Sequence, residues 1–508
     1  MRIAPLVLLL LAALSLNVGL TGCASGKIEN FTWRKLNTEH FTLISNAPRA
    51  ESVELARDVE RFRALVLNIS GATLTPETIP TKIYLFTDWG SYFKYTAGTS
   101  IVGFNYPTLR ANYIVISPGV LDSDPKRTIF HEYVHYLLRH QRSSFPAWYD
   151  EGFAQFMSDV TIRDGHVLVG NLPREKVEAY VWKWKLPLKQ VMTNDYVLDW
   201  APENVQAFYA ESWATVNYLL SGAALNDPAR TKQLATYLQL LNSGVGRDAA
   251  FATAFQTEYA TMTRQVKSFI ERRRLPGVDV AESSLSYKRW VREEVLETHQ
   301  VASDLGELTL LLGEHKAALA QSLFERTLQV DPKNSAARSG LAMALAEQTQ
   351  FERAIAEARQ AVDEDPTRAT AHLDFAKILF GVCGADTSAA PTPGCVEMLQ
   401  VARDQFERSL ELAPATPEGR AGIGMTLSRL QENPSRAIVS LNSVYDLSQW
   451  MPQLNLELAK LYARAGKADL ARQSLTQVVR WTKSNILRQQ AETMLAQMSG
   501  QASATFAD

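Results

Sequence analysis

Two histidines separated by three residues carry the clearest chemical signal in this chain of 508 residues. His131 and His135 begin and end the segment His-Glu-Tyr-Val-His, and residues four apart on a helix lie about 40° apart around its axis. Both imidazoles therefore project from one face, where they can bind one metal ion. Glu132 follows the first histidine, so its carboxylate lies beside the metal and can take a proton from a water molecule. The segment predicts a hydrolytic zinc site with Glu132 as general base.

A hydrolytic zinc site needs a third protein ligand and leaves its fourth position to water. Residues 146–154, Pro-Ala-Trp-Tyr-Asp-Glu-Gly-Phe-Ala, predict a second, apolar helix that starts at a proline turn and can fold back against the first. Glu151 in this helix is the candidate third ligand. A metzincin would instead carry glycine three residues after His135 and histidine three further on, but these positions are Leu138 and Gln141.

The residues before the motif predict the helix that must position it. Residues 123–125, Ser-Asp-Pro, offer a side-chain cap followed by proline at the first helical position. His140 lies near the far end of this helix, where we expect a cation beside the last carbonyls rather than a metal ligand. His40 and His166 lie far from the motif in the sequence, and we expect them to be structural.

Residues 31 to about 275 resemble the peptidase MA-like gluzincins, relatives of the thermolysin and alanyl-aminopeptidase group. The resemblance rests on the segments HEYVH, PAWYDEGFAQF and FYAESWATVNYL. It implies an α+β zincin-like catalytic domain, Zn²⁺ as the cofactor, and Glu151 of the Glu-Gly-x-Ala pattern as third ligand. It also implies that Tyr209, in the last segment, donates a hydrogen bond to the oxyanion of the tetrahedral intermediate.

Two neighbouring polar residues allow more than one interpretation. Tyr209 either takes this catalytic role or merely borders a buried helix face that contains Phe208 and Trp213. Asp150, next to the candidate ligand, either supports a ligand histidine or is a solvated carboxylate in the first turn of its helix.

Apolar segments ahead of the metal helix predict a small sheet and one long helix. Residues 38–45, 82–87 and 112–117 are strand-like, and residues 50–69 carry apolar side chains at helical spacing. In gluzincins an edge strand pairs with an extended substrate, so residues 112–117 either bind a peptide through main-chain hydrogen bonds or form a core strand. The Gly-x-Met-Glu-Asn segment with which aminopeptidases bind a substrate's amino terminus does not occur, which favours endopeptidase action.

Beyond residue 276 the sequence is rich in alanine and leucine and repeats every 34 residues, the period of tetratricopeptide repeats. Asp331-Pro332 recurs at Asp365-Pro366 after 34 positions, and Pro414 follows after a further 48, which indicates a 14-residue insertion within residues 381–394. We expect four to five repeats from about residue 302 to 483 and a capping helix to about 498. Such an all-α solenoid presents a concave surface to a protein partner.

The three cysteines have separate expected roles. Cys383 and Cys395 bracket the insertion and, in an oxidising compartment, are expected to form a disulfide. The N-terminal residues resemble a bacterial lipoprotein signal: a positive start, an apolar run over residues 4–16, and Leu-Thr-Gly-Cys ending at Cys23, which would receive lipid. Ala24 and Ser25 lack the aspartate that favours inner-membrane retention. The resemblance therefore implies an outer-membrane anchor facing the periplasm, with inner-membrane or secreted forms as alternatives.

The sequence thus predicts a signal peptide at 1–22, a tether at 23–30, a gluzincin-like metallopeptidase domain at 31–290, a tetratricopeptide-repeat domain at 291–498 and a flexible tail at 499–508. With 52 basic and 54 acidic residues and no basic block, nucleic acid is not an expected partner. The predicted function is a zinc-dependent endopeptidase of the bacterial cell envelope, whose repeats recruit a protein substrate or partner. The alternative is an envelope assembly factor or chaperone-like binding protein that acts through its repeats, with weak or latent peptidase activity.

Overall fold

The computed structural model describes residues 27–70, 79–96, 103–116, 125–139, 145–172, 177–178, 186–194, 200–222, 227–272, 275–384, 390–448, 451–482 and 484–504. The predicted signal peptide, the lipidation site Cys23, His140 and the cap residues 123–124 lie outside these ranges. Within them, no helix is both long enough and apolar enough to cross a lipid bilayer.

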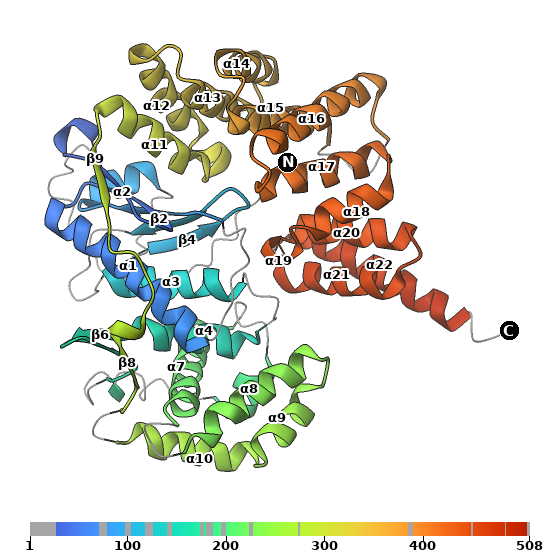
Figure 1. Cartoon of the computed structure of the whole chain (residues 1–508). Coiled ribbons are helices and arrows are strands. Elements are labelled where there is room, and N and C mark those ends of the chain that lie inside the picture. Colours follow the sequence, from blue (N-terminus) through green and yellow to red (C-terminus); the bar gives the residue numbers. More distant parts are fainter. Residues whose placement is uncertain are drawn as a thin grey trace.

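A six-stranded mixed sheet organises the N-terminal part of the chain (Figure 1). Its order is β4-β5-β3-β2-β1-β9, with bounds β1 (Arg34–Asn37), β2 (Phe41–Ser45), β3 (Thr81–Leu85), β4 (Gly103–Pro107), β5 (Asn112–Ile116) and β9 (Arg292–Val295). Strands β2, β3 and β5 run parallel, whereas β1, β4 and β9 pair antiparallel with their neighbours. The strand β9 lies just beyond the predicted domain boundary at residue 290, so the sheet takes its last strand from the segment that leads into the repeats.

The predicted strand at residues 112–117 forms as β5, but it lies between β3 and β4. The interpretation of this segment as an edge strand for substrate is therefore wrong. Among the described strands the edge on this side is β4. Gly103, Asn105 and Pro107 belong to residue types that are depleted in strands, which explains why the sequence pattern does not indicate β4.

Alternate residues of the sheet face two separate apolar cores. Leu43 and Ile83 pack in a cluster with residues of α1 (Arg49–Ser70) and α3 (Pro125–Arg139), on the face that Figure 1 shows below the sheet. Ile44 and Tyr84 point the other way, into a cluster with residues of α2 (Trp89–Tyr95) and α11 (Thr298–Leu310). Because strand side chains alternate between faces, one sheet supports both cores. The first helix of the repeats therefore covers one face of the N-terminal sheet.

Below the sheet, α3 packs on α4 (Ala147–Ser158), and α4 packs on α7 (Pro202–Leu220) (Figure 1). A small antiparallel sheet of β6 (Val160–Arg163), β7 (His166–Val169) and β8 (Val278–Ala281) flanks these helices. The remaining helices of this part are α6 (Leu188–Thr193), α8 (Ala229–Asn242), α9 (Arg247–Phe255) and α10 (Tyr259–Ile270).

In the described part of the chain beyond β9, five pairs of neighbouring antiparallel helices follow, and α22 (Asn485–Ala504) comes after the last pair (Figure 1). The pairs are α11 with α12 (Ala317–Val330), α13 (Ser335–Glu347) with α14 (Phe351–Glu364), α15 (Ala369–Gly384) with α16 (Pro393–Leu412), α17 (Pro417–Leu430) with α18 (Pro434–Asn442), and α20 (Pro452–Arg464) with α21 (Ala468–Trp481). The short helix α19 (Tyr445–Ser448) precedes the last pair.

One packing contact recurs along the array at the spacing that the sequence predicts. A Cβ on Gly340 would lie 2.3 Å from the ring of Phe324, and a Cβ on Gly422 would lie 2.3 Å from the ring of Phe406. The two contacts are 82 residues apart, which equals two 34-residue periods and the 14-residue insertion. The insertion contributes to the greater length of α15 and α16, which have 16 and 20 residues against 13 and 14 in the preceding pair. A disulfide joins Cys383 to Cys395 across it.

Candidate metal centre

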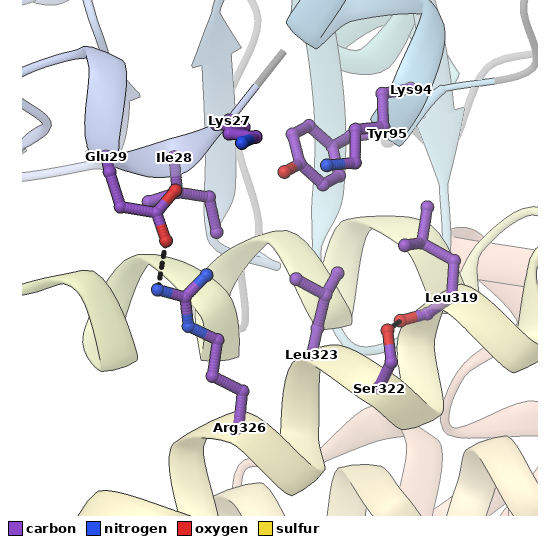
Figure 2. A pocket seen from close by; sticks show the side chains of 9 residues that line it. All are labelled: Lys27, Ile28, Glu29, Lys94, Tyr95, Leu319, Ser322, Leu323 and Arg326. Carbon is purple, nitrogen blue, oxygen red and sulfur yellow. Dashed lines mark hydrogen bonds and ion pairs between the residues drawn. The ribbon is translucent and has the colours of Figure 1, made fainter. Parts of the chain in front are cut away.

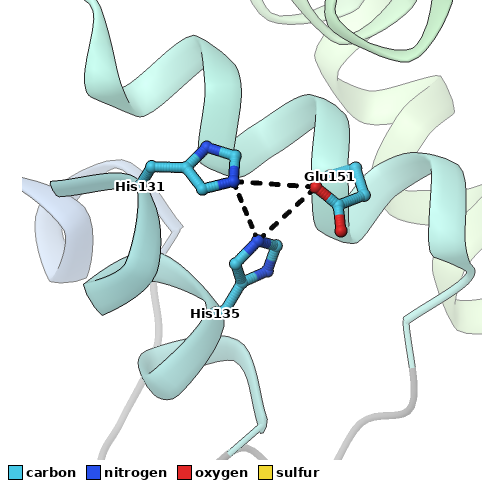
Figure 3. Close-up of side chains that lie close together, drawn as sticks. All are labelled: His131, His135 and Glu151. Carbon is cyan, nitrogen blue, oxygen red and sulfur yellow. Dashed lines mark hydrogen bonds and ion pairs between the residues drawn. The ribbon is translucent and has the colours of Figure 1, made fainter. Parts of the chain in front are cut away.

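The three predicted ligands lie together where α3 and α4 meet (Figure 3). His131 Nε2 is 3.1 Å from His135 Nε2, and Glu151 Oε2 is 3.7 Å from the first nitrogen and 3.5 Å from the second. A tetrahedral zinc ion with bonds of about 2.0–2.1 Å spaces its ligand atoms about 3.3 Å apart. The three atoms therefore fit such an ion without rearrangement, and all three side chains are buried.

Asp150 orients one of these ligands. Its Oδ1 lies 3.0 Å from His135 Nδ1, and because a carboxylate only accepts, the Nδ1 hydrogen is the donor. This leaves the Nε2 atom of His135 facing Glu151 and His131. A carboxylate behind a ligand histidine is a usual feature of metal sites, where it fixes the tautomer and the ring orientation. The structure therefore favours the first of the two interpretations of Asp150.

The site favours positive charge. Burial lowers the pKa of His135, but the carboxylates of Asp150 and Glu151 together outweigh burial and raise it to about 10. Two imidazole nitrogens and a carboxylate oxygen that converge in a buried space repel one another unless a proton or a cation lies among them. The donor set of two nitrogens and one oxygen suits zinc.

Glu132 lies on α3 next to the first ligand and is 2% exposed. Its main-chain carbonyl accepts a hydrogen bond of 3.2 Å from Asn105 Nδ2, which ties α3 to the edge strand β4. Sequence reasoning missed Asn105. A polar residue in a segment without strand periodicity carries no signal for this contact, which depends on how the sheet places β4 against the helix.

Tyr209 comes from α7, on the other side of α4. The negative charge of Glu151, followed by burial and the charges of Glu132 and Asp150, raises the pKa of its phenol well above the ordinary value. The phenol therefore remains protonated and lies within electrostatic range of these carboxylates. The side chain of Tyr209 is also partly buried against the apolar core, so both interpretations of this residue stay open.

Gly152 allows α7 to come this close. A Cβ at this position would lie 2.4 Å from the main-chain oxygen of Ser212 and 2.8 Å from Val216 Cγ2, both in α7. Real side chains do not tolerate such distances, so the Glu-Gly pair brings the third ligand and the helix of Tyr209 together. Sequence reasoning used this glycine as part of a motif without deriving its packing role.

The histidines expected to be structural contact other carboxylates. His40 Nδ1 is 2.8 Å from Glu60 Oε2, and His166 Nδ1 is 2.8 Å from Asp279 Oδ1. Neither histidine belongs to the three-residue group that can bind a metal in the described part of the chain.

A cavity of about 520 Å³ lies away from these residues, between α2, α12 and the first described residues of the chain (Figure 2). Lys27 and Lys94 line it, together with Glu29, which forms an ion pair with Arg326 of α12. Ile28 in the same segment is buried. Residues 27–30, the end of the predicted tether, are therefore packed against the first repeat.

The comparisons with known proteins bear on the C-terminal part of the chain. The family model of the tetratricopeptide repeat matches residues 311–373, which contain α12, α13, α14 and the start of α15. This match, together with the helical pairs, confirms the predicted repeats. Such arrays generally mediate contacts between proteins. No curated protein matches the chain.

Solved structures similar to the chain are repeat proteins. A thermophilic tetratricopeptide-repeat protein of Thermus thermophilus, TTC0263, is 19% identical, covers 39% of this chain and 99% of its own, and has a TM-score of 0.33. PilF of Pseudomonas aeruginosa is 18% identical, covers 40% of this chain and 87% of its own, and scores 0.32. PilW, a type IV pilus biogenesis factor, is 16% identical, covers 42% and 95%, and scores 0.32. The assignment of the repeats rests on the family match and the helical pairs rather than on these scores.

Proposed function

We propose that this protein is a zinc-dependent peptidase whose repeats bind a protein substrate or partner. The convergence of His131, His135 and Glu151 on one buried point is the observation that carries the proposal. Glu132 beside them strengthens it, because a zinc site with a purely structural role has no need of a buried general base.

In this proposal each residue near the site has one task. A zinc ion bound by the three ligands would polarise the scissile carbonyl and lower the pKa of a water molecule. Glu132 accepts the proton of the attacking water and passes it to the leaving amine. Tyr209 donates its hydroxyl hydrogen to the oxyanion, and the high pKa of its phenol keeps that hydrogen in place.

The edge strand β4 is where we propose that an extended substrate adds to the sheet. Among the described strands β4 has one partner, β5, and in this proposal its other edge pairs with the peptide. The hydrogen bond from Asn105 to the Glu132 carbonyl places this edge next to the helix that carries the general base. Cleavage within a bound strand is endopeptidase action, as the sequence also favours.

A second candidate function is that of an envelope assembly factor or chaperone-like binding protein, in which the repeats bind partners and the metal site is weakly active or latent. The family match to tetratricopeptide repeats favours this candidate more directly than it favours a peptidase. The buried Glu132 and the complete set of ligands favour the peptidase. Anchoring through lipidated Cys23 in the outer membrane, facing the periplasm, is compatible with both and remains a proposal.

The test compares wild type with Glu132→Gln for bound zinc and for cleavage of an unfolded protein. The peptidase proposal expects zinc in both and cleavage in wild type alone. Zinc in both without cleavage in either would favour the binding protein instead.

A further inference from the structure

The first helices of successive repeats present acidic side chains to the N-terminal part of the chain. Asp304 of α11 lies 2.7 Å from Lys35 of β1, and Glu307 of the same helix lies 2.6 Å from Lys82 of β3. The charges are complementary, with carboxylates on the repeats and cations on the sheet. Farther along the array, two other carboxylates accept hydrogen bonds from one arginine, Arg110.

Arg110 lies in the turn between β4 and β5 and reaches two repeats at once. Its Nε is 2.8 Å from Glu418 Oε2 of α17, and its terminal nitrogens form an ion pair with both carboxylate oxygens of Asp374 in α15. Lys377 Nζ lies 2.5 Å from the other oxygen of Glu418. Two carboxylates around the fork of a guanidinium make an arrangement that suits arginine and not lysine. We call Asp374 and Glu418 the arginine socket.

The two carboxylates of the socket are paired with two cations, Arg110 and Lys377. Burial raises the pKa of Glu418, but Arg110 and Lys377 outweigh it and lower the pKa to about 2. Asp374 and Glu418 have side chains that are 6% and 16% exposed, so their charges are poorly screened by solvent. Removal of Arg110 would leave Lys377 as the one cation in the described ion pairs of the socket.

The contact at Arg110 differs in kind from the contact at α11. At α11, Val301 and Leu305 pack with Tyr84 and Phe104 in one apolar cluster, which makes a permanent interface. At the socket, the described polar contacts are ion pairs, and 28% of the Arg110 side chain remains exposed. A second guanidinium would reach the two carboxylates, which are 6% and 16% exposed, only after Arg110 has moved away.

The turn that carries Arg110 leads to the candidate metal centre. Thr108 Oγ1 accepts hydrogen bonds from the main-chain nitrogens of Arg110 and Ala111, at 3.1 and 3.0 Å, which makes the turn a compact unit. The strand β4 precedes this turn directly, and its Asn105 binds the carbonyl of Glu132. Arg110 thus lies five positions after Asn105, the residue of β4 that binds the helix α3.

We propose that the arginine socket on α15 and α17 is a binding site for an arginine side chain of a partner protein, which displaces Arg110 and frees the β4–β5 turn. The chain's own arginine shows the chemistry that the site recognises. This inference goes beyond the proposed peptidase activity and does not depend on it.

The test uses a fluorescein-labelled peptide with the sequence of residues 103–112 as the probe, and a second peptide in which citrulline replaces the arginine. Binding to the full chain in detergent is measured by fluorescence anisotropy. In Arg110→Ala the socket is vacant, so we expect the arginine peptide to bind at least about tenfold more tightly than to wild type, whose socket is filled. The citrulline peptide should bind neither protein, and Arg110→Ala/Glu418→Gln should lose the gain.

Two controls separate this result from loss of fold. Arg61→Ala removes an arginine that pairs with Asp58 and Glu282, away from the repeats, and should leave peptide binding as in wild type. Arg110→Lys keeps a cation, so it should fold even where Arg110→Ala does not, and should bind the arginine peptide more tightly than wild type. Hydrogen exchange at the β4 amides of wild type should speed up when the peptide is saturating. Equal affinity of wild type, Arg110→Lys and Arg110→Ala, or equal binding of the citrulline peptide, would overturn the proposal.

Discussion

Gly152 of α4 packs directly against Ser212 of α7, since a Cβ on the glycine would lie 2.4 Å from the serine carbonyl oxygen. The glycine follows the third candidate ligand, and the serine lies three residues after Tyr209. One packing contact therefore sets the distance between the metal residues and the phenol.

Gly152→Ala should push α7 away from α4. Over-packing of this kind costs about 1–3 kcal/mol, so we expect the free energy of unfolding in urea to fall by that amount. Gly394→Ala is the matched control, because a Cβ there meets nothing within 4 Å. Its effect should stay within about 0.5 kcal/mol. Equal stability of Gly152→Ala and wild type would contradict the close approach.

Asp150→Asn should weaken metal binding without removing a ligand. The amide carries no negative charge beside His135 Nδ1, so it supports the tautomer with hydrogen on Nδ1 less firmly. We therefore expect zinc affinity to fall about 10-fold to 100-fold. Competition with a zinc chelator measures this. Asp248→Asn, which changes an exposed carboxylate paired with Lys189, should leave zinc affinity unchanged. A similar loss in both variants would exclude a specific role for Asp150.

Tyr209→Phe tests the oxyanion donor. Removing one such donor costs about 10²–10³-fold in kcat, whereas zinc content should remain that of wild type. Tyr259→Phe is the control, since its phenol donates to Asp248 in a different part of the domain. Unchanged kcat in Tyr209→Phe would return this residue to the interpretation in which it only borders a buried helix face.

The stability that Glu418 provides should depend on pH. Its pKa is lowered from 4.5 to about 2 in the folded chain, so its contribution is fully present above 4.5 and is lost as the pH falls toward 2. We expect Glu418→Gln to cost up to about 3 kcal/mol at pH 6 and less than half of that near pH 3, measured by urea unfolding. A difference that is the same at both pH values would show that the ion pair with Arg110 does not stabilise the fold.

The sequence predicts those features of the structure whose residues lie within a short stretch of the chain. One turn of helix separates His131 from His135 and brings both imidazoles to one face. The 34-residue period predicts the helical pairs, in which Phe324 packs on Gly340 and Phe406 packs on Gly422 at equivalent positions. Glu151 could be selected because a proline turn before it allows its helix to fold back. Each of these features is encoded within a few tens of residues.

Contacts between distant segments could not be predicted in this way. Arg110 pairs with Asp374, 264 positions later, and nothing around either residue marks the other. The edge position of β4 depends on the strand order of the whole sheet, so the sequence left open whether residues 112–117 form an edge strand or a core strand, and β5 lies inside. The hydrogen bond from Asn105 to the Glu132 carbonyl follows from the same arrangement. Sheet topology, rather than residue pattern, decides these contacts.

The most direct measurement of the central claim compares wild type and Glu132→Gln in the form that begins at residue 24. Bound metal is measured by mass spectrometry, and cleavage of casein is followed in the same preparations. We predict one zinc ion per chain in both proteins, with cleavage in wild type and none in Glu132→Gln. His131→Ala, as a control, should lose both zinc and cleavage. Undiminished zinc-dependent cleavage by Glu132→Gln, or chains that bind no zinc, would contradict the account.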